Sequence, residues 1–262
     1  MIIEKEFTSA AALRQAVRSG RHRGPTAGLA PGFVQTNVVV VPSAAAEEFA
    51  EFCRINSRAC PLIERTAPGD PEPKHAAPGA DLRTDVPRYR IFRGGVPEVA
   101  EPSEIRDLWR DDFEGFLLGC SFTFESALVA AGLPVRHIEL GSNVPMYRTK
   151  IECRPAGRFA GPLVVSMRPF RPEQVEQVRE ISGRYPTMHG EPVQVGDPAV
   201  LGIYNLGRPD FGDAVPIEAG EVPVFWACGV TPQLALTAAR LELAITHSPG
   251  CMFVTDLREE AC

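Results

Sequence analysis

Proline is the residue that most constrains this chain, because it occurs 25 times in 262 residues, roughly double its usual share of ~5%. Proline fixes φ and removes a backbone donor, so each one favours a turn or the end of an element. Glycine adds 23 residues, and the two types together stay below the ~25–30% that marks a low-complexity chain. With 44% hydrophobic and 23% charged residues the chain can fill a core, in one large domain or two smaller ones.

The net charge and the cysteines narrow the class of partner. Asp and Glu outnumber Lys and Arg by 33 to 27, which disfavours a nucleic-acid backbone or a membrane as the main partner and favours a small molecule. The seven cysteines form no CxxC pair, and we find neither a secretory signal nor a stretch of ~18–20 apolar residues that could span a membrane. We therefore expect a cytoplasmic protein with reduced thiols, of a size compatible with a homodimer.

Five segments carry helix signals. The segment 103–120 is the strongest, because its apolar residues recur every three or four positions and place Cys120 at the end of a buried stripe. Capping residues, a glycine stop or a first-turn proline mark the other four. These are expected at Ser9–Ser19, from Ser43 to about Cys53, at Pro172–Gly183 and at Thr231–Thr246.

Short β-branched or apolar runs between these helices suit buried strands. They are Val38–Val41, Leu163–Ser166, Val222–Trp226 and Met252–Thr255, with Tyr89–Phe92 as a weaker candidate. The alternation predicts an α/β fold, with a layered α/β sandwich domain made of residues 1–140 plus 225–262, and ligands gathered at the carboxyl ends of strands. Residues 141–224 are rich in proline and contain strand-like pieces with one helix, so we expect a smaller inserted α+β subdomain there.

Arginines cluster where an acidic ligand could be held. Three of them fall within ten residues, and Arg148 follows a Pro-Met-Tyr sequence. Arg binds a carboxylate through two parallel hydrogen bonds, so Arg83, Arg88 and Arg148 are candidates for substrate binding, together with the adjacent Tyr89. The alternative is a solvated strand edge with local ion pairs.

Two turns before helices could bind an anion or activate a nucleophile. Cys120 and Ser121 place a thiol and a hydroxyl at the junction of two helix signals, where a helix start could lower the thiol pKa. Gly229 and Thr231 lie in a turn between a strand and a helix, which presents backbone N–H groups and a hydroxyl. The alternatives are structural: a last core cysteine followed by a serine cap, and an ordinary turn with a threonine cap.

Histidines in turns rich in Gly and Pro are the candidates for proton transfer. His189 lies in one such turn, and His247 lies in another that is followed by Asp256, so their side chains could converge on a cleft. The alternative for each histidine is a structural hydrogen bond.

Signals for a metal or cofactor are weak. No HxxxH or HExxH pair supports a zinc site on a helix, and no cofactor motif is evident. The acidic turns at Asp197, Asp210 and Asp213 could either bind a divalent metal or cap turns, which leaves a metal requirement open.

Nine segments form an ordered set that spans nearly the whole chain, from about residue 26 to 256. They are Thr26–Pro42, Phe52–Glu64, Asp81–Phe92, Gly119–Leu128, Val144–Thr149, Gly161–Pro169, His189–Pro198, Val222–Gln233 and Ile245–Asp256. Each string is modest by itself, but all nine in this order are specific. Together they resemble the D-glutamate cyclase-like family of hydro-lyases.

The resemblance implies an α/β sandwich with a smaller inserted α+β part. It also implies hydro-lyase chemistry on a small amino or hydroxy acid, with D-glutamate closing to 5-oxo-D-proline as the named reaction. Such a reaction needs a carboxylate clamp, a base, an acid and donors for an oxyanion. The alternatives are a non-catalytic protein that binds a small carboxylate and a hydro-lyase for a different acid. Our candidates are Arg83, Arg88 and Arg148 for the clamp, His189 or His247 with Asp256 for proton transfer, and Cys120, Ser121 and the turn of Gly229 and Thr231 for the oxyanion.

Overall fold

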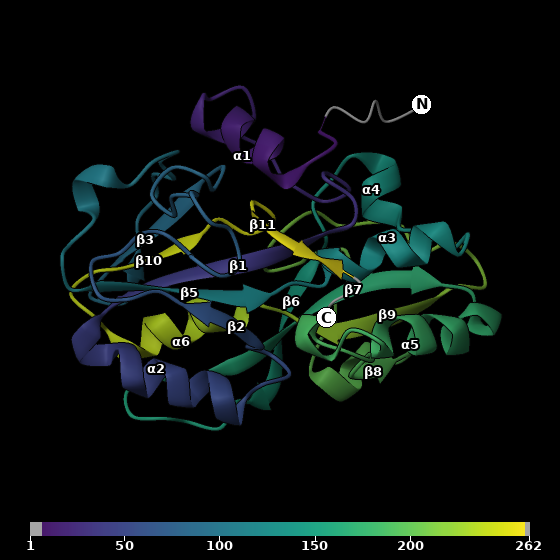
Figure 1. The fold of residues 1–262 in the computed structure, drawn as a ribbon. Coiled ribbons are helices and arrows are strands. Elements are labelled where there is room, and N and C mark those ends of the chain that lie inside the picture. The colour runs from purple at the N-terminus through teal and green to yellow at the C-terminus, as the bar shows by residue number, and fades with distance from the viewer. Residues whose placement is uncertain (1–6, 260–262) are drawn as a thin grey trace.

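A computed structural model describes residues 7–259, which form two antiparallel sheets with helices packed around them (Figure 1). Seven strands make the larger sheet, called sheet A here. Its order is β2 (Leu62–Arg65), β5 (Phe113–Gly119), β1 (Phe33–Pro42), β10 (Ala244–His247), β3 (Tyr89–Arg93) and β4 (Val96–Pro97), with β11 (Phe253–Arg258) paired to β1. Four strands make sheet B. Its order is β6 (Met146–Glu152), β7 (Pro162–Phe170), β9 (Val222–Ala227) and β8 (Gln194–Val195).

The predicted α/β class is confirmed, with helices and strands in comparable amounts. Every strand pair in the described residues is antiparallel, however, so the carboxyl ends of neighbouring strands lie at opposite edges of a sheet, and the expectation that ligands gather at the carboxyl ends of strands stays a prediction. Sheet B takes all its strands from residues 146–227. The division of the chain into two domains at residues 141 and 224 stays a prediction.

Strand β1 is the centre of sheet A, and its residues are buried on both faces except at the last position. It pairs with β5 along Thr36 to Pro42. On its other side it pairs first with β11, up to Thr36, and then with β10, from Val39. Asn37 and Val38 therefore lie where β1 changes partner.

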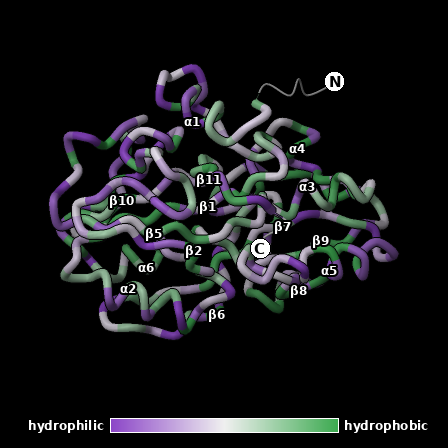
Figure 2. The backbone as a smooth tube through the Cα atoms, in the orientation of Figure 1, coloured by the Kyte–Doolittle hydropathy of each residue, from purple (hydrophilic) through white to green (hydrophobic). Residues whose placement is uncertain are grey.

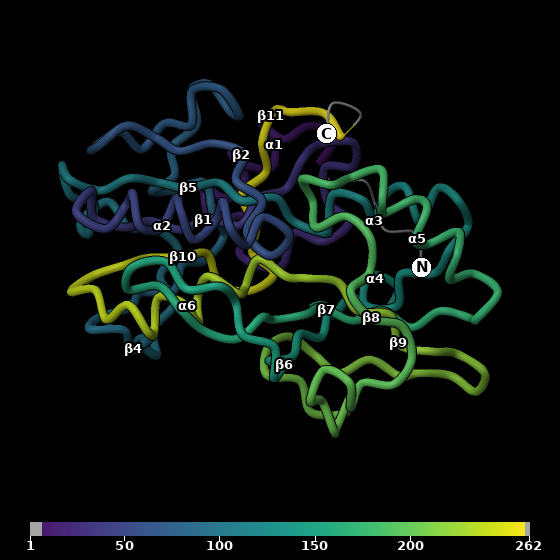
Figure 3. Tube along the Cα trace, turned by 90° about the horizontal axis from the view of Figure 1, so that it is seen from below, coloured from purple at the N-terminus to yellow at the C-terminus, as the bar shows by residue number. Residues whose placement is uncertain are grey.

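Helices cover both faces of sheet A. On one face, α2 (Ser43–Ile55) and α6 (Thr231–Ala239) share an apolar core with β1 and β5, whereas α1 (Ala10–Arg18) packs on the opposite face near β11 (Figures 1 and 3). Apolar residues follow the interior strands in Figure 2. None of the helices in the described residues is long and apolar enough to cross a membrane.

Most of the remaining helices belong to the half of the molecule that contains sheet B, whereas η1 (Arg106–Leu108) packs against sheet A through Leu108. α3 (Phe122–Ala130) and α5 (Val175–Gly183) share a core with β7 and β9, around Phe124 and Trp226. The other shorter elements are α4 (Arg136–Leu140), η2 (Pro172–Gln174), η3 (Pro186–Met188) and η4 (Pro198–Leu201).

Three helix predictions are confirmed in α1, α2 and α5, and the strand predictions are confirmed in β1, β3, β7, β9 and β11. The helix predicted over 103–120 is wrong: the segment forms the short η1 and then strand β5, buried at every position between β1 and β2. A strand buried on both faces carries apolar residues at most positions, so its spacing can imitate a helix. The helix predicted from Thr231 ends at Ala239, and residues up to His247 form β10 instead.

Candidate active site

A cleft of about 260 Å³ lies where the start of β3 meets the turn after β10 and the segment that leads into β6. Charged and polar side chains from five parts of the chain line it. The lining residues are Arg88, Arg90, Glu101, Asn143, Asp210, Phe211, Gly212, Ser248 and Pro249. We refer to this set as the cleft.

Strand alternation brings Arg88 and Arg90 to the cleft. Residues two apart on a strand share a face, so the residue between them, Tyr89, points to the other side. There Tyr89 is fully buried and donates from its hydroxyl to the Leu82 carbonyl over 2.7 Å, and burial raises its pKa well above the ordinary value. Tyr89 thus anchors the strand, while the two arginines face the cleft.

Glu101 lies between the two arginines. Its Oε1 accepts from Arg90 Nη2 over 3.0 Å, and its Oε2 lies 3.8 Å from Arg88 Nη1. Arg90 also donates to Gln233 Oε1 of α6 over 3.2 Å, which fixes its guanidinium. Arg88 is held less tightly and keeps more of its hydrogen-bonding capacity for a ligand.

Three buried polar atoms of the cleft have no hydrogen-bond partner within the described residues. Residues 7–259 contain seven buried side-chain atoms of this kind. Three of the seven belong to residues of the cleft: Arg88 Nε, Asn143 Oδ1 and Ser248 Oγ. Buried polar atoms are nearly always paired, because an unpaired one costs about 1–3 kcal/mol. Their concentration on one cleft marks the place where a polar ligand can supply the missing partners.

Tight backbone contacts hold Asn143 in place. Its Nδ2 donates to the Pro249 carbonyl over 2.9 Å, and its backbone N–H donates to Asp213 Oδ2 over 2.9 Å. Gly250 has a φ of +88°, and a Cβ there would meet the Asn143 side chain at 2.4 Å. The turn after β10 therefore requires glycine so that Asn143 can approach.

The predicted clamp residue Arg148 lies behind the wall of the cleft. Its guanidinium stacks on the Phe211 ring with 5.7 Å between Cζ and the ring centroid, and Arg90 stacks on the same ring at 5.9 Å. Arg148 also pairs with Asp210 at 3.6 Å, and its side chain is 55% exposed. Arg148 thus supports Phe211 but does not line the cleft.

His247 is buried inside sheet A, next to Ser248 of the cleft. Its Nδ1 contacts the backbone of Val38 at 3.2 Å, which is the point where β1 changes partner, whereas its Nε2 has no hydrogen-bond partner among residues 7–259. Burial, reinforced by the positive charge of Arg90, lowers the pKa of His247 to about 4 despite the Val38 contact. The imidazole is therefore neutral at pH 7.

His189 lies elsewhere, in a pocket with Ser57 and Thr187. It ends the short helix η3 with a φ of +79°, which is unusual for a residue other than glycine. Its Nδ1 lies 2.8 Å from the Arg58 carbonyl, and burial lowers its pKa to about 4. The two predicted histidines are thus not brought to one site.

Cys120 and Ser121 follow β5 and are buried. Burial raises the pKa of the Cys120 thiol far above its usual range, so it is not a thiolate at neutral pH. Ser121 Oγ accepts from Arg168 Nη2 over 2.9 Å, and Arg168 also forms a fully buried ion pair with Glu125. This pair joins α3 to β7 of sheet B.

The Gly229–Thr231 turn is occupied by structural contacts. A Cβ on Gly229 would meet Asn37 Nδ2 at 2.0 Å, so only glycine fits against that side chain. Thr231 Oγ1 donates to the Cys228 carbonyl over 2.7 Å and accepts from the Val164 backbone over 3.0 Å. Neither Gly229 nor Thr231 lines the cleft.

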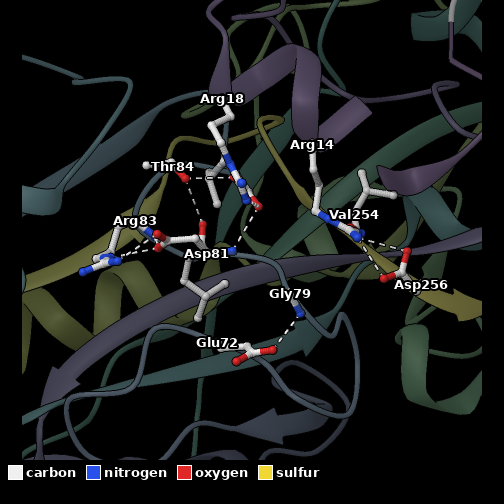
Figure 4. A network of polar contacts seen from close by, with 12 residues as sticks. Arg14, Arg18, Glu72, Gly79, Asp81, Arg83, Thr84, Val254 and Asp256 are labelled. Carbon is white, nitrogen blue, oxygen red and sulfur yellow. Dashed lines mark hydrogen bonds and ion pairs between the residues drawn. The ribbon is translucent and has the colours of Figure 1, made fainter. Parts of the chain in front are cut away.

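Arg83 and Asp256 lie in a polar network beneath α1 (Figure 4). Arg83 pairs with Asp81 through two hydrogen bonds of 2.9 Å, and Asp256 pairs with Arg14 of α1 at 2.8 Å. Both side chains are therefore engaged with neighbours outside the cleft.

The acidic turns receive backbone donors. Asp197 accepts from Ala199 N, Asp210 from Arg148 N and Asp213 from Asn143 N, each over 2.8–2.9 Å. Among the described residues, no three His, Cys, Asp or Glu side chains are grouped so that they could hold a metal ion.

Sequence reasoning counted Arg90 in the arginine cluster without assigning it to the site, and it missed Glu101, Asn143 and Ser248. The signal for Arg90 was present, because alternation along the predicted strand Tyr89–Phe92 places it on the face of Arg88. Ser248 directly follows the candidate His247. Glu101 and Asn143 lie in loops, and no local pattern ties them to β3.

Comparisons with known proteins identify the family. A model of the family described as D-glutamate cyclase matches residues 115–256, just over half of the chain. A protein of Rubrobacter xylanophilus named "Putative hydro-lyase" is 60% identical over 250 residues, covering 95% of this chain and 96% of that protein. Relatives with the same description from Stutzerimonas stutzeri and Cupriavidus taiwanensis are each 56% identical, covering 96% and 94% of this chain and 95% and 92% of their own lengths.

Among solved structures, a nitrogen repressor-like protein from Methanococcus jannaschii aligns over 94% of this chain and 98% of its own. The TM-score is 0.39 and the sequence identity is 8%, values at which no shared fold is inferred. The family match and the close relatives agree with each other and with the ordered motifs of the sequence. The chain therefore belongs to the D-glutamate cyclase family and is an enzyme of the hydro-lyase class.

Proposed function

We propose that the cleft binds a small amino dicarboxylate and that the enzyme closes D-glutamate to 5-oxo-D-proline with loss of water. The supporting observation is the pair Arg88 and Arg90, which face one cleft together with three buried polar atoms that lack partners among the described residues. Arginine is suited to a carboxylate, and unpaired buried atoms favour a ligand that pairs them. The family match supports the reaction class.

The reaction balances without a co-reactant. The amino nitrogen forms a bond to the carbon of the distal carboxylate, and one C–O bond of that carboxylate breaks. The oxygen leaves as water with two protons from the ammonium group. The enzyme must therefore hold both ends of the substrate, accept a proton from nitrogen and return protons to the leaving oxygen.

We assign these tasks to residues of the cleft. Arg88, whose Nε is unpaired within the described chain, binds a substrate carboxylate. Glu101, already held between the two arginines, accepts the two ammonium protons one after the other and returns each to the leaving oxygen, so that it ends the reaction as the carboxylate. Ser248 Oγ donates to the developing oxyanion, and Asn143 Oδ1 accepts from the substrate nitrogen.

The test compares Arg88→Ala and Arg90→Ala with Arg93→Ala, a matched control. Arg93 is on the same strand but is exposed and pairs with Glu98, away from the cleft. Purified proteins are incubated with D-glutamate, L-glutamate and 5-oxoproline, and the products are followed by chiral chromatography. We expect the wild type to turn over D-glutamate, and the two cleft variants to lose ~10²-fold or more in kcat/KM while Arg93→Ala keeps it.

Two results would contradict the proposal in different ways. If D-glutamate is converted and Arg88→Ala stays within about threefold of the wild type, the site is wrong. If neither enantiomer of glutamate is converted, the substrate is wrong, and other amino or hydroxy acids are then tried on the same variants. Thermal stabilisation by glutamate without turnover would instead support a protein that binds a carboxylate without catalysis.

A further inference from the structure

A second pocket, of about 340 Å³, lies between α3, α4 and the loop at residues 28–31. It shares no lining residue with the cleft. Its walls are mostly apolar and include Phe7, Leu29, Phe122 and Ile138. Its volume falls in the range of pockets that hold small molecules.

One wall of this pocket carries a buried charge. Glu125 of α3 is 1% exposed, and its Oε1 accepts from Arg168 Nε over 2.8 Å and from Arg168 Nη2, with His137 Nε2 3.2 Å away. Burial opposes ionisation, but His137 and Arg168 outweigh it, so the pKa of Glu125 is lowered and the side chain is a carboxylate.

The second oxygen of this carboxylate, Oε2, is buried and accepts no hydrogen bond from the described residues. The Glu125 side chain contacts Arg168 and His137 through Oε1, and Glu125 is one of the residues that line the pocket. An ionised oxygen without a donor is unfavourable, and a bound donor relieves that cost.

We propose that this pocket binds a small apolar molecule that carries one ammonium group. The ammonium donates to Glu125 Oε2, and the apolar part of the ligand packs on Phe122 and Ile138. A cation is favoured over a neutral donor because a second carboxylate, Glu259, also lines the pocket, where it accepts from Ser126 Oγ and Gly32 N. This site is separate from the cleft and does not depend on the proposed function.

The test compares three probe molecules of similar length. Hexylamine, hexanol and hexanoate share an apolar chain and differ in the head group. Calorimetry on the full chain at pH 7 should show saturable binding of hexylamine with a 1:1 ratio, at least tenfold weaker binding of hexanol, and none of hexanoate. Equal binding of all three would mean that the pocket selects only for apolar surface, which would overturn the proposal, as would no binding at all.

Variants locate the binding. Ala130 lines the pocket and is exposed, so Ala130→Trp narrows the entrance without touching Glu125, and we expect it to weaken hexylamine binding tenfold or more. Ala131→Trp is the control, because Ala131 is the next exposed residue and does not line the pocket. If the two variants bind alike, hexylamine binds elsewhere and the assignment fails.

A third variant separates this site from the cleft. Arg88→Ala should bind hexylamine as tightly as the wild type, whatever its effect on glutamate. Loss of hexylamine binding in Arg88→Ala would place the amine in the cleft and overturn the second site. Glu125→Gln keeps the shape of the side chain and removes its charge, so it should favour hexanol relative to hexylamine if the variant folds.

Discussion

His247 Nδ1 lies 3.2 Å from both the backbone nitrogen and the carbonyl oxygen of Val38, where β1 exchanges β11 for β10 as its neighbour. Val38 pairs with Leu117 of β5 on one side, and on the other side, where no strand residue pairs with it, the imidazole contacts its backbone. The next residue, Ser248, lines the cleft. The histidine thus links the register of sheet A to the position of a cleft residue, without lining the cleft itself.

The two buried histidines make the stability of the enzyme depend on pH. His247 and His189 have pKa values of about 4 in the folded protein, because burial disfavours their charged forms. The ordinary value is about 6.5, so below that pH the unfolded chain binds protons that the folded chain does not. The free energy of unfolding should therefore fall as pH drops from about 6.5 towards 4, by about 2 kcal/mol per histidine between pH 7 and pH 5.

Urea unfolding at pH 7 and pH 5 measures this loss. The double variant His189→Gln, His247→Gln should lose less stability than the wild type between the two pH values, whatever its stability at pH 7. An unchanged loss in the double variant would show that other groups cause it.

The buried ion pair of Arg168 and Glu125 should be costly to break. Arg168→Met removes the partner of a carboxylate that is 1% exposed and leaves a charge in the core. We expect a loss of about 3–5 kcal/mol in the free energy of unfolding, measured with urea. Adding Glu125→Gln should recover part of that loss, because the buried charge is then removed. A double variant as unstable as the sum of both single variants would contradict this account.

Ser248 should matter for activity but should not stabilise the fold. Its Oγ is buried without a partner among the described residues, so Ser248→Ala removes no hydrogen bond of the folded protein and removes an unpaired buried group; the free energy of unfolding should not fall and should rise by up to about 1–3 kcal/mol. The same change should lower kcat/KM by ~10-fold or more if the hydroxyl contacts the substrate. Thr231→Val is the contrasting control, since Thr231 Oγ1 has two backbone partners and its loss should destabilise the fold.

Gly229 should tolerate no side chain while Asn37 is present. A Cβ at Gly229 would meet Asn37 Nδ2 at 2.0 Å, so Gly229→Ala should cost about 1–3 kcal/mol by overpacking. Asn37→Ala removes the clash, although it also removes the hydrogen bond of 2.8 Å to the Gly119 carbonyl. In a double-mutant cycle, the two changes together should cost less than their sum. Simple additivity would show that the contact is not what requires glycine.

Local signals were enough for elements that are specified by nearby residues. Helix α1 begins after Ser9, whose side chain accepts from Ala12 N, and a serine cap can be recognised in a sequence. The segment 103–120 also begins on a serine, but its apolar spacing fits both a helix and a strand buried on two faces, and no side-chain cap forms at the start of η1. The neighbours β1 and β2 decide between them, and both lie far away in the sequence.

The candidate site was predicted only in its arginine-rich part. Arg88 was found because arginines cluster before β3, and Arg90 could have been found from the same strand by alternation. Arg83 and Asp256, equally plausible by residue type, pair with Asp81 and Arg14 instead. Residue type shows what a side chain can bind, but the fold decides which partner is within reach.

The sequence by itself determined the mixed α/β composition, several helix starts, the main apolar strands and the family. Only the tertiary structure decided that the strands pair in antiparallel order and that Asn143 and Ser248 meet Arg88 at one cleft. The physical reason is the separation along the chain between the residues that interact. Caps and hydrophobic periods act within a few residues, whereas the cleft depends on contacts between segments more than a hundred residues apart, such as Asn143 Nδ2 with the Pro249 carbonyl.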